Sequence, residues 1–147
     1  MRDIIDTIIH HEGLRLAVYD DATGNVIESG SKVKGNPTIG VGRLLTAGRG
    51  ITKEEARYLL NNDLEIVSQE LDKNKPFWRT LPDNAQIVVM SMTFNCGYPR
   101  YAKFKKHWKC LEAKDWYNAG LELESSVWWG QVGRRGPELQ QLLFDIT

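Results

Sequence analysis

The chain has 147 residues, of which 41% are apolar and 26% charged, with 19 basic and 19 acidic side chains. This length suits one compact domain with its own core, and the composition excludes a disordered chain. Zero net charge excludes a global field that attracts nucleic acid or an anionic surface. We therefore expect a single domain over residues 1–147.

The first predicted element is an amphipathic helix over residues 3–12. Asp3 can cap its start, and Gly13 is a typical stop. Its apolar side chains follow the helical period: Ile4, Ile5, Ile8 and Ile9. Glu12 continues this stripe at the end of the helix.

A small antiparallel sheet is predicted next, in a lobe over about residues 14–50. Apolar and other residues alternate from Leu14 to Tyr19, which indicates a strand. Residues 20–25 are typical of a turn, and 26–28 are a candidate second strand. Residues 38–42 form a short Gly-rich strand.

From Thr52 onward the pattern is helical. Thr52 and Glu55 form a capping box, and an apolar stripe then predicts a long helix over about 52–72. A second helix opens at Pro82 and is apolar nearly all round, as in a central buried helix. Later helices are predicted at 101–111, 115–125 and 137–145.

The fold class is therefore α+β. We expect an N-terminal sheet lobe, an interlobe helix over 52–72, and a larger helical lobe over 73–147 that also includes the helix 3–12. A cleft between the two lobes is the expected ligand site.

Three residues around the predicted sheet could carry chemistry. Glu12 sits at the negative end of its helix dipole and extends an apolar stripe, and both features favour a neutral carboxyl that donates a proton. Asp21 lies in a polar turn that keeps a carboxylate ionised, and Thr38 begins a strand. Each has an ordinary structural explanation, but one acid and one carboxylate beside the same sheet are what glycoside hydrolysis requires.

The chain resembles the phage-type lysozymes, glycoside hydrolase family 24. The signature of that family is matched by Glu12-Gly13-Leu14-Arg15-Leu16, Tyr19-Asp20-Asp21 and Thr38-Ile39-Gly40-Val41-Gly42. Further matches are Ile51-Thr52-Lys53-Glu54-Glu55-Ala56, Phe94-Asn95-Cys96-Gly97, and Trp128-Trp129-Gly130-Gln131 with Arg134-Arg135. The matches cover nearly the whole chain in the right order.

The resemblance implies a role for each matching residue. Glu12 is the expected general acid, Asp21 the second carboxylate with Asp20 as the alternative, and Thr38 the residue that holds the attacking water. Leu44, Phe94 and Asn95 are expected to contact the sugar. Arg135, or alternatively Arg134, is expected to orient the acid. The resemblance also implies inversion at the sugar carbon, with the two carboxyl groups about 6.5–9.5 Å apart.

The chain departs from the family pattern at several positions. The segment between Asp21 and Thr38 is longer than the usual short turn. Arg43 replaces a frequent histidine, so we expect an ion pair with Asp63 that mild acid leaves intact. His107 and Glu122 replace small polar residues, and those contacts are not carried over.

Other residues point to structure rather than chemistry. Cys96 and Cys110 belong to no metal-binding pattern, so neither a metal nor another cofactor is expected. The tryptophans favour core packing over sugar stacking. The basic segment 100–109 is interpreted as a solvated helix face, with an anion-docking patch as the alternative.

The expected function is that of a lysozyme that cleaves bacterial peptidoglycan between N-acetylmuramic acid and N-acetylglucosamine. The sequence shows no signal peptide and no membrane span. We therefore expect a monomer made in the host cytoplasm that reaches the wall after a holin, a separate pore-former, opens the membrane. One alternative is an inactive wall-binding module. Another is a nucleic-acid-binding protein, which the zero net charge disfavours.

Overall fold

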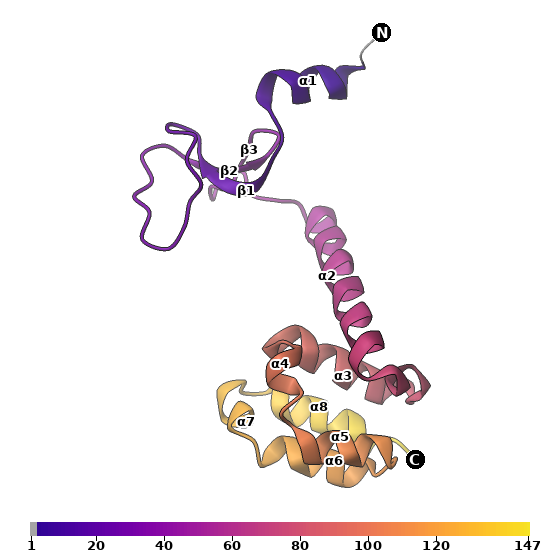
Figure 1. The fold of residues 1–147 in the computed structure, drawn as a ribbon. Helices are drawn as coiled ribbons and strands as arrows, with labels where there is room; N and C mark the ends of the chain where they lie inside the picture. The colour runs from indigo at the N-terminus through magenta and orange to yellow at the C-terminus, as the bar shows by residue number, and fades with distance from the viewer. Residues whose placement is uncertain (1–2) are drawn as a thin grey trace. The chain divides into compact units, whose positions relative to one another are not determined.

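A computed structural model describes residues 3–147, and these fall into two compact units. The first unit ends at Arg57, and the second is Tyr58–Thr147. The architecture is α+β, as predicted, with a three-stranded antiparallel sheet and eight α-helices in the described residues (Figure 1). None of the helices in residues 3–147 is both long and apolar enough to cross a bilayer. The expected grouping of the first helix with the helical lobe stays a prediction.

The first unit begins with helix α1 (Ile4–Glu12), in agreement with the sequence analysis. Asp3 caps it, because its carboxylate accepts a hydrogen bond from the Asp6 N–H at 2.8 Å. The helix ends at Gly13, whose φ of 78° is readily available only to glycine. This stop fixes Glu12 as the last helical residue.

The sheet of the first unit has the strand order β1-β2-β3. Its strands are β1 (Arg15–Asp20), β2 (Pro37–Gly40) and β3 (Arg43–Leu44). The expected strand over 26–28 is wrong, since Val26 makes only an isolated bridge to Tyr19. The chain turns away just beyond, where the Ser31 N–H donates to the Glu28 carbonyl at 3.0 Å.

Helix α2 (Lys53–Asn74) crosses the boundary between the two units. Its predicted capping box is confirmed: the Glu55 N–H donates to Thr52 Oγ1 at 3.1 Å, and the Thr52 N–H donates to Glu55 Oε1 at 3.4 Å. Only the far end of its apolar stripe is buried, at Val67 and Leu71. Both residues belong to the core of the second unit.

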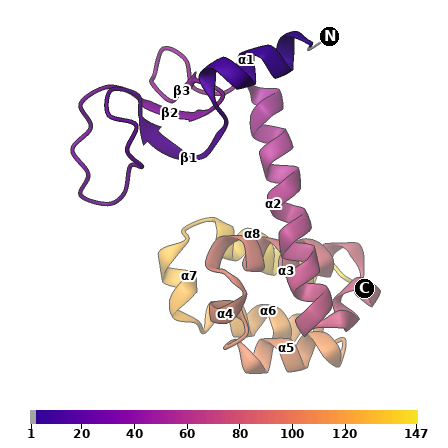
Figure 2. The same cartoon turned by 45° about the horizontal axis from the view of Figure 1, so that its top comes forward.

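The second unit is helical. After α2 come η1 (Pro76–Thr80), α3 (Asp83–Cys96), α4 (Tyr98–Tyr101), α5 (Lys105–Glu112), α6 (Trp116–Glu124), α7 (Val127–Gln131) and α8 (Arg135–Phe144). Helix α6 packs against α5 and α8, and α3 also packs against α8 (Figure 2). The short helices α4 and α7 were not predicted, because four or five residues are too few to show a helical period.

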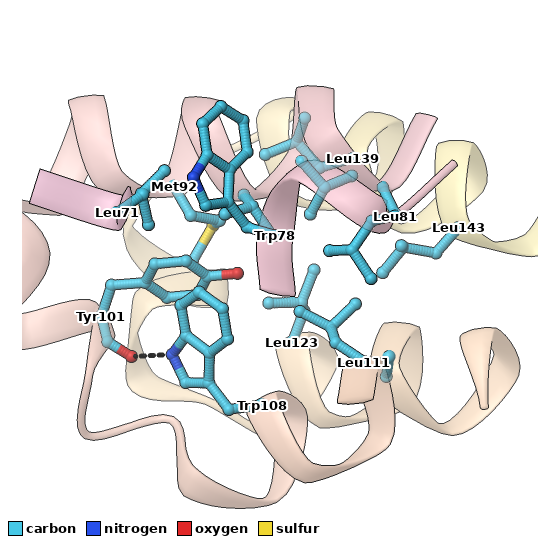
Figure 3. Close-up of a cluster of buried hydrophobic side chains, with 14 of the residues drawn as sticks. Leu71, Trp78, Leu81, Met92, Tyr101, Trp108, Leu111, Leu123, Leu139 and Leu143 are labelled. Atoms are coloured by element: carbon cyan, nitrogen blue, oxygen red, sulfur yellow. Dashed lines mark hydrogen bonds between the residues drawn. The ribbon is translucent and has the colours of Figure 1, made fainter. Parts of the chain in front are cut away.

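A single apolar core fills the second unit (Figure 3). Trp108 and Trp128 are 3% and 1% exposed, which confirms that these rings pack in the core. Their ring N–H groups are satisfied: Trp108 donates to the Tyr101 carbonyl at 3.0 Å, and Trp128 donates to Asn95 Oδ1 at 2.8 Å. The core thus fixes Asn95 at the end of α3.

Candidate functional site

Asp21 and Thr38 lie at the end of the β1–β2 pair, where both contact Asn36. The Asn36 N–H donates to Asp21 Oδ1 at 2.7 Å, and its Nδ2 donates to Asp21 Oδ2 at 3.4 Å. The Asn36 carbonyl accepts from Thr38 Oγ1 at 2.9 Å and from the Asp21 N–H at 3.2 Å. The geometry therefore brings one predicted carboxylate and the predicted hydroxyl to the two sides of one residue.

Asp20 and Asp21 have opposite environments although they are neighbours. Asp20 is 3% exposed, and its carboxylate accepts hydrogen bonds from three backbone N–H groups: Lys34 at 2.7 Å, Gly35 at 2.9 Å and Ala22 at 2.9 Å. The Lys34 N–H, with the other two, holds the pKa of Asp20 below its ordinary value. Asp21 is exposed, so its carboxylate is the one that a substrate or water can reach.

Glu12 lies in the same unit as these residues and is exposed at the end of α1. A Cβ atom built on Gly42 would lie 3.7 Å from Glu12 Oε2. The Glu12 carboxyl is therefore beside the turn that joins β2 to β3. The predicted acid, the second carboxylate and Thr38 all come from one small unit, on α1, at the end of β1 and on β2.

Arg43 has a partner that the sequence analysis did not name. Its Nη1 lies 2.7 Å from Glu55 Oε2 and donates to the Gly50 carbonyl at 3.2 Å. The hydrogen bond from Arg43 lowers the pKa of Glu55. Glu55 is also held by the capping box with Thr52, in the same unit as Arg43. Asp63 belongs to the second unit, and its expected pair with Arg43 stays a prediction.

The other predicted site residues are divided between the units. Leu44 pairs with Thr38 across β2 and β3 in the first unit. In the second unit, Phe94 is 48% exposed and lines a cavity of about 1060 Å³ together with Arg134 and Arg135. Their expected contacts with sugar or with Glu12 stay predictions. Asn95 uses its side-chain oxygen to hold Trp128.

His107 is a buried neutral residue and does not belong to the basic surface around it. It is 1% exposed, and its Nδ1 lies 2.8 Å from the Ala119 carbonyl, which can only accept. Nδ1 therefore carries the proton, and Nε2 accepts from the Tyr101 hydroxyl at 2.7 Å. Burial lowers the pKa of His107 to about 4.

The cations of segment 100–109 are mostly exposed, in keeping with a solvated face. Four of them line a cavity of about 570 Å³ that Glu122 also lines: Arg100, Lys103, Lys105 and Lys106. Arg100 donates to Gln131 Oε1 at 2.6 Å. Within residues 3–147, no three His, Cys, Asp or Glu side chains gather as a metal site would require.

The roles of Asp20 and Asn36 were not anticipated from the sequence. A buried carboxylate needs hydrogen-bond donors, which the sequence does not reveal. The sequence shows only that Asp20 is the first of two neighbouring aspartates at the end of a predicted strand. Asn36 acts mainly through its backbone, which the amino-acid type does not reveal.

Comparison with known proteins assigns the family. The chain is similar to "Probable T4-type lysozyme 2" of Dictyostelium discoideum, at 24% identity over an alignment 158 residues long. The alignment covers 88% of this chain and 86% of the relative. It is 23% identical to "Probable T4-type lysozyme 1" of the same organism, over 90% of this chain and 88% of the relative. Residues 9–142 match the family described as Phage lysozyme. The match covers most of the chain, and the protein therefore belongs to the phage lysozyme family.

Proposed function

We propose that this protein hydrolyses the β-1,4 bond between N-acetylmuramic acid and N-acetylglucosamine in bacterial peptidoglycan. Family membership supports glycosidase activity on peptidoglycan. The observation that carries the proposal is the cluster of an exposed Asp21 carboxylate and the Thr38 hydroxyl around Asn36, in the same unit as Glu12.

In this mechanism Glu12 protonates the glycosidic oxygen as the bond to the sugar carbon breaks. Asp21 accepts a proton from water, which attacks the opposite face of the sugar and inverts the anomeric carbon. The Thr38 hydroxyl donates a hydrogen bond to the Asn36 carbonyl, so the lone pairs of Oγ1 are left to accept from that water. Asp21 is preferred over Asp20 because the oxygens of Asp20 are already used by three backbone N–H groups.

The decisive experiment compares Glu12→Gln and Asp21→Asn with the native protein on purified peptidoglycan. General acid catalysis contributes about 10²–10⁴-fold, so Glu12→Gln should lower the release of reducing ends by about that factor. Glu112→Gln, on an exposed residue at the end of α5, is the matched control and should retain activity. Full activity in Glu12→Gln would refute the acid assignment.

The stereochemical course is tested by proton NMR on the first product formed. Inversion of a β-linked sugar predicts the α anomer. A β product would mean retention and would exclude direct attack by water held at Asp21. Tight binding to the wall without any release of reducing ends would favour the inactive wall-binding module.

The expected placement of Arg135 is part of the same proposal. We propose that its guanidinium orients Glu12, as the family resemblance implies, with Arg134 as the alternative. Both arginines are exposed and line the same cavity in the second unit. Arg135→Lys should lower kcat more than Arg134→Lys, and the opposite order would exchange the two roles.

The proposed biological setting is release of phage progeny from within the host, after a holin opens the membrane. The family supports a phage context, and the Dictyostelium relatives show that its members also occur in a eukaryote. Expression in bacteria with and without a membrane pore-former tests the setting. Lysis only when the pore-former is present is the expected result, and lysis without it would exclude the dependence.

A further inference from the structure

Asp20 holds together both ends of the long loop that joins β1 to β2. Its Oδ1 accepts from the Ala22 N–H, where the loop begins, and from the Gly35 N–H, where the loop ends, each at 2.9 Å. Its Oδ2 accepts from the Lys34 N–H at 2.7 Å. A single buried carboxylate therefore closes a loop of more than ten residues.

The closure sets the position of the next residue, Asn36. Its N–H donates to Asp21 Oδ1 at 2.7 Å, and it directly follows Lys34 and Gly35, which Asp20 holds against the start of the loop. The approach is close: a Cβ atom on Gly35 would overlap Asp21 Oδ1 and would lie 2.8 Å from the Ala22 nitrogen. Only glycine at position 35 lets the loop end come this near to Asp21.

We propose that Asp20 is a positioning residue for Asp21, which it orients through the loop end Lys34–Asn36. This inference rests on the proposed role of Asp21 in hydrolysis. Asp20 need not touch substrate, because both of its carboxylate oxygens are already bound to backbone N–H groups. It holds the Asn36 N–H and carbonyl where they fix the Asp21 carboxylate and the Thr38 hydroxyl.

Asp20→Asn is the principal test. An amide has one acceptor oxygen, and its NH₂ group faces backbone N–H donors, so the loop end loses at least one hydrogen bond. A displacement of about 1 Å at a catalytic group costs up to about 10²-fold in rate. We expect kcat per folded molecule to fall about 10- to 100-fold, with KM within about twofold of the native value.

Two further variants separate this role from a general loss of folding. Gly35→Ala leaves Asp20 intact but places a methyl group against Asp21 Oδ1, so it should lower kcat in the same way. Asp6→Asn makes the same chemical change on an exposed residue of α1 and should leave kcat unchanged. Amide hydrogen exchange adds a direct readout: the Lys34 and Gly35 amides should be protected in the native protein and exchange faster in Asp20→Asn.

The outcomes distinguish this inference from the proposed function. Native kcat in Asp20→Asn, with Asp21→Asn inactive, overturns the positioning role and leaves the function standing. An inactive Asp20→Asn beside an active Asp21→Asn makes Asp20 itself the second carboxylate and overturns the inference. If the native protein hydrolyses no peptidoglycan, the proposed function fails, and unchanged exchange at Lys34 and Gly35 in Asp20→Asn then refutes the loop closure as well.

Discussion

Each of the two units of this molecule is stabilised internally by a different kind of interaction. In the second unit, sixteen buried apolar residues form one core, from Val67 on α2 to Leu143 on α8. In the described part of the first unit, the buried residues are Asp20 and Thr38, and both are polar. Hydrogen bonds and backbone closure define the first unit, whereas apolar packing defines the second.

This difference separates the determinants of activity from those of stability. Polar contacts contribute little net free energy but have strict geometry, which suits groups that must face a reacting bond. Apolar burial contributes most of the free energy of folding. Changes at Asp20 or Asp21 should therefore affect the rate first, and changes in the core should affect the free energy of unfolding first.

The largest effect on stability is expected from Leu111→Ala. Leu111 is fully buried, and removal of a buried leucine side chain costs about 2–5 kcal/mol from lost burial and the cavity left behind. Urea denaturation measures the loss, with Leu121→Ala on the 36% exposed surface of α6 as the control. At urea concentrations well below its unfolding midpoint, the Leu111 variant should retain native kcat. A large fall in kcat there would contradict the assignment of activity to the first unit and stability to the second.

His107 gives the second unit a stability that depends on pH. Burial lowers its folded pKa from 6.5 to about 4, so the unfolded chain binds a proton first as pH falls. The contribution is complete above about pH 6.5 and is lost as pH falls toward about 4. The shift corresponds to about 3 kcal/mol.

Denaturation at several pH values tests this contribution. The native protein should lose stability between pH 6.5 and 4 more steeply than His107→Gln, whatever the absolute stability of the variant. Equal slopes would show that the imidazole does not cause the loss. Asp20, whose pKa is lowered from its ordinary value of 3.8, loses its contribution mainly below about pH 4, so a loss of stability between pH 6.5 and 4 tests His107 rather than this carboxylate.

The smallest effect is expected at the ion pair between Arg43 and Glu55. The side chains are 27% and 40% exposed, and exposed pairs of this kind contribute little to the free energy of unfolding. Glu55→Gln should therefore lower the free energy of unfolding slightly, and the difference from native should shrink as salt is added. A large loss of stability that salt does not change would show that the first unit depends on this pair far more than its exposure implies.

The sequence was informative where a pattern is local. Asp3, Gly13 and the Thr52–Glu55 box were predicted correctly, because caps need only a few neighbouring residues. Trp108 and Trp128 were correctly assigned to the core, since large rings in helices are seldom left exposed. The strand at 26–28 was wrong because pairing depends on the path of a distant segment.

The site was predicted in part, for the same reason. The motif named Glu12, Asp21 and Thr38, whose catalytic roles stay predictions, and the structure places all three in the first unit. The motif did not supply the backbone contacts of Asn36 or the burial of Asp20, which arise only when residues fifteen positions apart meet. The partner of Arg43 was also missed, because Glu55 was assigned only to its capping box.

Closure of the long loop by Asp20 has a consequence for protein engineering. With both ends fixed on one carboxylate, the tip around Ser29 and Gly30 is exposed and anchored independently of its length. Doubling the length of a flexible loop costs only about 0.6 kcal/mol in closure entropy. The tip is therefore a suitable graft position for a wall-binding peptide or a fluorescent reporter.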